Sequence, residues 1–301
     1  MPLLALQWQE QDLKFEQIEV ALANKQLELS IPSLDLAQTT AQLLAIDLLG
    51  DTLKETVKTL SLAGELEQVS LNLSRNPTPR KTPRFILKAN MLNVSVDAWK
   101  GAPGATGISG YLEASPTGGF VELETESFSL VFPLLYRKPL DFNSGKGKVS
   151  WKITDDRVYV DSGLLYLTAD HGPATALLDL DLPKNADSDI PPEMILAIGL
   201  TDTAASYKDK FIPYTLNQNF LDWISGSVPE GRLIDGGFIY RGSLRKADVK
   251  DRTVQLYLNV EDATLDYHPD WPKLTAIRGL VEVNNAAVEV NATDAKMYDM
   301  D

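Results

Sequence analysis

Apolar and polar residues alternate with a period of two along most of this chain. The alternation is clearest over residues 149–153, 174–182 and 254–260, where Val, Leu, Ile, Ala and Trp take turns with polar or charged residues. Neighbouring side chains of a β-strand point to opposite faces, so each segment would present one apolar and one solvated face. The chain is therefore predicted to be mainly β, with antiparallel strands.

Two segments are predicted to be β-hairpins of the same design. Residues 151–160 and 281–290 each consist of two short alternating runs joined by a polar turn, Asp155-Asp156 in the first and Asn284-Asn285 in the second. Their apolar positions match one to one: Trp151 with Val281, Ile153 with Val283, Val158 with Val288, and Val160 with Val290.

Helical periodicity is confined to about residues 40–60 and about residues 216–226. Each predicted helix is followed by a glycine, Gly64 or Gly231, and then by a further strand. A supersecondary unit that occurs twice indicates repeated β units that share a continuous apolar face.

Composition predicts three β-rich units. They cover residues 1–75 with the helix at 40–60, residues 84–182, and residues 193–301 with the helix at 216–226. The segments between them, 76–83 and 183–192, are rich in proline and polar residues, which is typical of loops. The strands of all three units could also form one continuous sheet.

Charge and composition exclude several functions. The chain has 28 Lys and Arg against 42 Asp and Glu, a net charge of −14 at pH 7. This charge repels a phosphate backbone, so nucleic acid is not expected as a partner. Without cysteine there is no disulfide and no thiolate metal site. The apolar runs are far shorter than the ~20 residues of a membrane-spanning helix.

Candidate catalytic residues are few. His171 and His268 lie far apart in the sequence without a metal-binding spacing, and we expect both to be solvated loop residues. Glu122, Glu124 and Glu126 share one face of a predicted strand, where a glycosidase could place paired carboxylates, but alternating acids are also typical of a solvated face. We therefore expect no enzymatic activity, no catalytic residue, no metal site and no cofactor.

The long apolar face needs a cover. Monomeric proteins rarely expose more than a few hundred Å² of contiguous apolar surface, and two short helices are few for a sheet of this size. Two alternatives follow from the residues alone. The sheet could close on itself as a sandwich or barrel, or it could curl around a ligand with acyl chains.

The C-terminal part of the sequence resembles a known family. The resemblance is carried by Phe211-Ile212-Pro213-Tyr214, Leu221-Asp222-Trp223-Ile224, Gly231-Arg232-Leu233, Gly236-Gly237-Phe238, Gly242, Asp270-Trp271-Pro272-Lys273-Leu274 and Gly279. In this order the motifs are similar to those of the large AsmA-like envelope proteins of Gram-negative bacteria, in particular the YhdP branch. The resemblance covers about residues 85–301 and, more loosely, the first 84. The family's N-terminal membrane helix has no counterpart, so we expect an internal fragment.

The resemblance implies both a fold and a function. The fold would be an elongated, curved antiparallel sheet that forms a groove from repeated β units. The chain would be a periplasmic segment of a protein anchored in the inner membrane, and it would carry phospholipid between the inner and outer membranes. Its partners would be phospholipid acyl chains, membranes contacted by other parts of the full-length chain, and other envelope proteins.

Two residue sets follow from these interpretations. The first is an apolar lining for acyl chains: Trp151, Ile153, Val158, Val160, Leu256, Leu258, Val281, Val283, Val288 and Val290. The second set matches the family motif and is expected to be structural, with glycines in tight turns and tryptophans anchoring helix against sheet: Pro213, Trp223, Gly231, Trp271, Pro272 and Gly279.

Two other functions remain open from the sequence. One is an envelope scaffold or a regulator of outer-membrane assembly that acts through protein contacts, with its apolar face closed on itself. The other is an enzyme acting on envelope glycans through the Glu122, Glu124 and Glu126 row.

Overall fold

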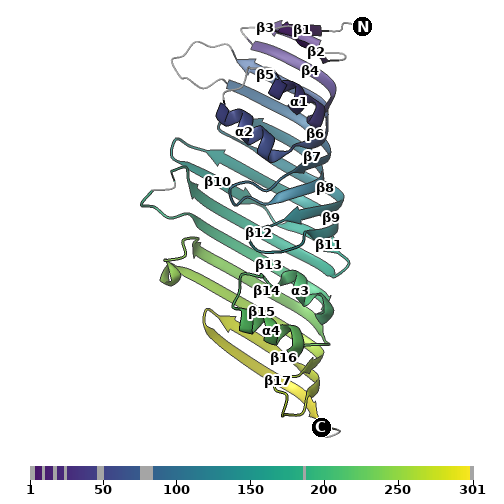
Figure 1. Cartoon of the computed structure of the whole chain (residues 1–301), viewed down its shortest axis with the longest axis vertical. Coiled ribbons are helices and arrows are strands. Elements are labelled where there is room, and N and C mark those ends of the chain that lie inside the picture. Colours follow the sequence, from purple (N-terminus) through teal and green to yellow (C-terminus); the bar gives the residue numbers. More distant parts are fainter. Residues whose placement is uncertain are drawn as a thin grey trace. The chain divides into compact units, whose positions relative to one another are not determined.

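The computed structural model describes residues 4–8, 11–15, 19–23, 26–45, 51–74, 84–185 and 188–298, and these residues are mainly in β-strands, as predicted (Figure 1). Fifteen strands belong to antiparallel sheet, in which hydrogen-bonded neighbours are mostly sequence neighbours. A separate hairpin joins β1 (Leu4–Trp8) and β2 (Gln11–Phe15). The chain divides into two compact units: unit 1 is Met1–Phe132 with Ser144–Asp155, and unit 2 is Pro133–Asn143 with Asp156–Asp301.

Unit 1 pairs its strands in sequence order, from β3 to β8. It also contains the C-terminal part of β9. The elements are β3 (Glu19–Ala23), β4 (Gln26–Asp35), α1 (Leu36–Ala45), α2 (Asp51–Leu60), β5 (Ala63–Ser74), β6 (Arg84–Val96), β7 (Gly104–Ser115), β8 (Gly118–Val131) and β9 (Leu140–Ile153).

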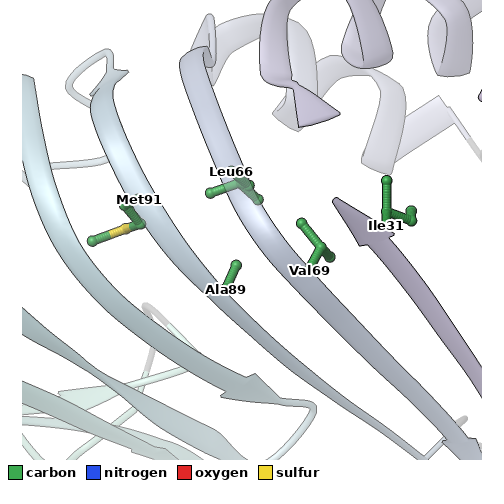
Figure 2. Packing of buried hydrophobic residues seen from close by; sticks show 5 residues of the cluster. All are labelled: Ile31, Leu66, Val69, Ala89 and Met91. Atoms are coloured by element: carbon green, nitrogen blue, oxygen red, sulfur yellow. The ribbon is translucent and has the colours of Figure 1, made fainter. Parts of the chain in front are cut away.

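The core of unit 1 lies on one face of its sheet. Ile31 pairs with Val69 across β4 and β5, and Leu66 pairs with Met91 across β5 and β6. Figure 2 shows these four side chains with Ala89 on neighbouring strands, and all five are buried. Leu36, the first residue of α1, packs against this cluster, so the helix begins on the apolar face of the sheet.

The helix predicted over 40–60 is two helices in the structure, α1 and α2. Residues 46–50, which connect them, lie outside the described residues. Asp35 caps α1 because its carboxylate accepts a hydrogen bond of 2.7 Å from the backbone N–H of Gln38. The pattern therefore located the helical region correctly but not its division.

Bulges recur in several strands of unit 1. Gln68 in β5, Asn93 in β6 and Ser127 in β8 each have a φ near +50°, and the strand register shifts at all three. Such a bulge bends its strand and increases its twist. The period-two pattern does not reveal these positions, because each bulge interrupts it by only one residue.

Hydroxyl groups satisfy backbone atoms beside these bulges. The backbone N–H of Asn93 donates to Oγ of Ser109, and the N–H of Ser109 donates to Oγ1 of Thr125, both at 3.1 Å. Thr125 in turn donates to the carbonyl oxygen of Gly107 at 2.8 Å. A buried Thr125 therefore replaces ladder hydrogen bonds that the bulges break.

Unit 2 continues the same construction. β12 pairs with β10 and β11, and the pairs from β12 to β17 follow sequence order. The elements are β10 (Arg157–Ser162), β11 (Leu165–Ala169), β12 (Gly172–Pro183), β13 (Glu193–Ala204), η1 (Ala205–Tyr207), α3 (Lys208–Phe211), α4 (Gln218–Ser227), β14 (Arg232–Ser243), η2 (Val249–Asp251), β15 (Arg252–Leu265), β16 (Leu274–Asn284) and β17 (Ala287–Met297).

The helix predicted near 216–226 is confirmed as α4. Its N-cap is Asn217, whose side-chain oxygen accepts hydrogen bonds from the backbone N–H groups of Asn219 and Phe220. The short helix α3 was not predicted, since four residues contain too little sequence for a helical period.

The two predicted helix–glycine–strand units share a structural feature. Gly64 and Gly231 both have positive φ, and a Cβ at either position would approach the neighbouring strand within about 3 Å, at Asn93 and at Ala263. Both contacts lie at bulges, because Asn93 has a φ of 50° and Asp262, next to Ala263, has a φ of 48°. Each glycine thus lets a strand begin close to a bulged neighbour.

The division into two units falls inside the predicted segment 84–182. Residues 76–83, together with Ala186 and Asp187 of the second predicted loop, lie outside the described residues. Arg157 donates to Asp181 and, at 3.5 Å, to the carbonyl of Pro191, and so ties the described part of the second loop to β10 and β12. The three-unit division itself stays a prediction.

Candidate functional site

Six of the ten predicted lining residues form two rows across three strands of unit 2. In the first row Leu256 of β15 pairs with Val283 of β16, which pairs with Val288 of β17; in the second row the pairs are Leu258 with Val281 and Val281 with Val290. Directly paired residues of antiparallel strands share a face. The predicted hairpin at 281–290 is also confirmed by this register.

Val158 and Val160 belong to the same face of unit 2. They pair with Leu182 and Leu180 of β12. Two alternating positions along β12 lead from Leu180 to Ala176, and a cross-strand row runs from there to the lining residue Leu256: Ala176, Ile198, Phe238 and Leu256. Sequence reasoning did not assign Ile198 and Phe238 to this face, although their register places them in the middle of it.

Trp151 and Ile153 lie on the apolar face of unit 1. A Cβ on Gly119 would approach Cζ2 of Trp151 to 2.7 Å, so the indole ring lies over Gly119. Gly119 pairs with Ala114, and Ala114 with Leu87, which packs against the buried cluster of that unit. Ile153 is two residues from Trp151 in β9 and points to the same side.

No second layer of strands covers the apolar face of unit 2 in the described part of the chain. Its lining residues on β10, β15 and β16 are only half-buried, and Val288 and Val290 on β17 are 66% and 61% exposed. β17 is the last strand of the hydrogen-bonded order and pairs only with β16, so the described sheet is open at this strand.

The opposite face of unit 1 carries exposed ion pairs. Lys148 contacts Glu122 at 2.9 Å, Lys146 contacts Glu124 at 3.5 Å, and both ion pairs are solvent-exposed. The side chain of Lys148 also lies 3.7 Å from the centroid of the Phe120 ring. The row of Glu122, Glu124 and Glu126 therefore stands on a solvated surface and not in a cleft suited to glycoside hydrolysis.

Among the family-motif residues, the glycines lie at close backbone contacts as expected, whereas the tryptophans are exposed. Gly231 allows the close approach described above, and a Cβ on Gly279 would come within 2.6 Å of the carbonyl oxygen of Asn291. Pro213 and Pro272 lie in loops. Trp223 and Trp271 are 45% and 60% exposed, so the structure does not place them as buried anchors; Leu221 and Ile224 of α4 are less exposed than Trp223.

His171 corrects one expectation. It is not a solvated loop residue, because only 3% of it is exposed and the rings of Phe142, Tyr207 and Phe211 surround it. Neither ring nitrogen has a hydrogen-bond partner among the residues that the structure describes. Burial, and secondarily the charge of Lys210, lower the pKa of His171 below its usual value of 6.5. The sequence could not reveal this, because Phe211 is far from His171 along the chain.

In the described ranges no group of His, Asp and Glu side chains is arranged to hold a metal ion. Nδ1 of the exposed His268 accepts a hydrogen bond of 3.2 Å from the backbone N–H of Asp270 and lies 3.9 Å from the carboxylate of Asp270. None of the described helices has both the length and the apolar character needed to span a bilayer.

A comparison with known families decides the identity of the chain. The family model described as "YhdP protein" matches residues 1–301. The chain belongs to the YhdP family. No curated protein and no solved structure matches it. Membership in the YhdP family associates this chain with the bacterial envelope and with a lipid-transport type of role, in a family that is not known for enzymes.

Proposed function

We propose that this YhdP-family chain is a non-enzymatic carrier segment for phospholipid. Acyl chains would lie against the apolar faces of the units while the polar headgroups remain in water. The intact protein would be anchored in the inner membrane, and this periplasmic segment would form part of a bridge to the outer membrane. The substrate class is taken from the family and from the chemistry of the face.

A single observation carries the proposal. Apolar residues form uninterrupted cross-strand rows on a face that the described residues leave without a second layer. A row such as Leu258, Val281 and Val290 offers a continuous apolar surface across successive strands. An uncovered surface of this kind marks a binding site in a soluble protein.

The energetics fit movement without a chemical step. Burial of apolar surface contributes about 25 cal/mol per Å², wherever on a uniform face the contact is made. An acyl chain that moves from one row to the next exchanges equivalent contacts, so the free energy changes little along the path. Such a carrier needs no catalytic residues, which agrees with the solvated Glu122 row.

The experiment places one charge on the proposed lining. Leu258→Asp and Val283→Asp should abolish photo-crosslinking of a diazirine-labelled phospholipid, because each carboxylate would be desolvated by an acyl chain. Gln255→Asp and Asn284→Asp are matched controls, since these exposed residues lie on the same strands and point to the opposite face. Unchanged crosslinking in the lining variants, with circular dichroism as in the parent chain, would contradict the proposal.

Extraction of lipid from the gently purified chain provides a second measurement. Mass spectrometry should detect stoichiometric phospholipid in this chain and none in a soluble protein with a closed core. Absence of lipid from a folded chain, together with unchanged crosslinking, would favour the scaffold function.

A specific observation keeps the scaffold function as a second candidate. Leu177, Ala197 and Ile239 form a cross-strand row on the otherwise polar face of unit 2, and Leu177 and Ile239 are exposed, as is Ile195 in β13. Such side chains suit contact with another envelope protein. If Ile239→Asp removed an envelope-protein partner from a pull-down with the full-length protein while Leu258→Asp did not, contact through this face would be supported.

A further inference from the structure

Two segments of unit 2 that are far apart in sequence are fastened to each other. The backbone N–H of Tyr214 donates to the carbonyl oxygen of Leu135 at 3.0 Å, and the Tyr214 hydroxyl donates to the carbonyl of Pro133 at 2.8 Å. Tyr136 donates in the other direction, to the carbonyl of Phe211 at 3.3 Å. Residues 133–139 are therefore held beside the loop that connects α3 and α4; these two helices are green in Figure 1.

The two joined segments, together with helix α4 that follows the α3–α4 loop, expose large apolar side chains. Leu134 is 65% exposed, and Leu216, Phe220 and Trp223 are each 45% exposed. The rings of Phe220 and Trp223 lie 6.3 Å apart, one turn from each other on α4. We call these side chains, with Leu135 and Tyr214, the loop patch. Exposure of this much apolar surface on preorganised segments indicates a contact made by something outside them.

The charge around the loop patch is opposite to that of the whole chain. Residues 133–139 and 207–224 contain four basic side chains, Arg137, Lys138, Lys208 and Lys210, and two acidic ones, in a chain of net charge −14. Arg137 lies 5.6 Å from the centroid of Tyr214, and Lys210 lies 5.5 Å from that of Tyr207.

These basic groups are not neutralised by carboxylates. Within the described part of the chain none of the four forms an ion pair, whereas Arg157, Arg232 and Lys273 of the same unit each pair with an aspartate. Guanidinium and ammonium groups that retain free donors are suited to phosphate oxygens. The patch thus combines apolar surface with cations that can accept an anionic ligand.

We propose that the loop patch binds an anionic phospholipid, held one molecule at a time. Its phosphate and headgroup contact Arg137, Lys138 and Lys210, and the first part of its acyl chains lies on Leu134, Phe220 and Trp223. The inference rests on the proposed carrier function, to which it adds a preference for anionic headgroups. Cations fastened beside exposed leucine and aromatic side chains match a molecule that has a phosphate next to hydrocarbon, and a free phosphate would leave the apolar part without a partner.

Short-chain lipids allow a direct test. Binding of dihexanoyl phosphatidylglycerol, dihexanoyl phosphatidylcholine and glycerol phosphate to the purified chain would be measured below the critical micelle concentration of the lipids. We expect the phosphatidylglycerol to bind about tenfold more tightly than the phosphatidylcholine at low salt, and this difference to shrink as salt screens the cations. Glycerol phosphate should bind at least tenfold more weakly than the phosphatidylglycerol.

Variants separate the two halves of the patch. Arg137→Ala, Lys138→Ala and Lys210→Ala together should remove the preference for phosphatidylglycerol, because binding of this anionic lipid should weaken more than binding of the zwitterionic phosphatidylcholine. Lys246→Ala with Lys250→Ala removes two exposed cations elsewhere in unit 2 and should have no effect. Leu134→Ala with Phe220→Ala should weaken the binding of phosphatidylglycerol and of phosphatidylcholine by the same factor. All seven positions are exposed, so circular dichroism should match the parent chain.

Contrary outcomes are distinguishable from failure of the carrier function. Equal binding of both lipids, with Leu258→Asp still blocking them, would overturn the headgroup site and leave the carrier. Glycerol phosphate that binds as tightly as phosphatidylglycerol would mean a site for free phosphate and would overturn the lipid assignment. Loss of all lipid binding, in a folded parent chain that also copurifies without lipid, would overturn the carrier function itself.

Discussion

The hydroxyl of Tyr214 donates a hydrogen bond of 2.8 Å to the carbonyl oxygen of Pro133, across 81 residues of sequence. With the backbone hydrogen bond from Tyr214 to Leu135, it holds the two segments of the loop patch together. This bond therefore connects the stability of unit 2 with the proposed site.

Removal of the hydroxyl should be measurable. Tyr214→Phe is expected to lower the free energy of unfolding by about 0.5 to 1 kcal/mol, as for one partly exposed hydrogen bond. Urea unfolding followed by circular dichroism measures it. Tyr166→Phe is the matched control, because Tyr166 is exposed and its hydroxyl has no hydrogen bond within the described structure. Equal stability of both variants would mean that Tyr214 does not fasten the segments.

A methyl group at Gly110 should be strongly destabilising. Gly110 has a φ of +148°, and a Cβ there would lie 2.0 Å from the carbonyl oxygen of Glu122. We expect Gly110→Ala to lose roughly 2 to 4 kcal/mol, from backbone strain and displacement of the neighbouring strand. Gly226→Ala in α4 meets no atom within 4 Å and should instead gain up to about 1 kcal/mol through helix propensity. In thermal unfolding, the melting temperature of Gly110→Ala should lie below that of the parent chain and the melting temperature of Gly226→Ala above it.

Stability should depend on pH through His171. Its pKa is lowered in the folded chain, so as pH falls through about 6.5 the unfolded chain takes up a proton before the folded chain does. The contribution is fully present above pH 6.5 and is lost as the pH falls below it. The melting temperature of the parent chain should therefore decrease more between pH 7 and pH 5 than that of His171→Leu.

The exposed histidine provides the control for this effect. His268→Leu is the comparison variant, because it removes a histidine whose side chain is 51% exposed. If His171→Leu and the parent chain lost stability in parallel as the pH falls, the prediction for His171 would be wrong.

Bulge positions offer a gain in stability. Ala276 has a φ of 49°, a conformation that costs a residue with a Cβ about 1 to 2 kcal/mol. Ala276→Gly should therefore raise the free energy of unfolding by about 0.5 to 1 kcal/mol, even after the added flexibility of the unfolded chain. Ala292→Gly, in the adjacent strand β17, should lower it by a similar amount, because Ala292 has no positive φ. Denaturant titrations of both variants test the contrast.

The sequence predicted those parts of the fold that have a local signal. Alternation identified the strands, and the Asn284-Asn285 turn identified the hairpin in which Val281 pairs with Val290. The bulges were not predicted, because the residue types Gln68 and Ser127 do not indicate a φ near +50°. Among the bulge positions, only the Asn and Asp residues are of types that favour this conformation.

The candidate site was predictable in part for the same reason. The register places the proposed lining on apolar faces, as a period of two requires, while the role of these residues stays a prediction. The loop patch was missed because it depends on contacts between residues 133–139 and 211–214, which no local pattern connects. The prediction that His171 is solvated was wrong for the same reason. A turn residue becomes buried only when another element packs on it, and no local pattern shows that contact.

The paired rows of β15 and β16 also determine how the chain can change length. Loss of one residue before Leu256 would move Leu256 and Leu258 into the places of Gln255 and Tyr257. The apolar side chains of β15 that follow the deletion would then point to the solvated face. Loss of two residues would keep the faces and shift only the pairing. Single-residue insertions and deletions in these strands should therefore be tolerated far less well than substitutions, except beside a bulge, where one extra residue is already accommodated.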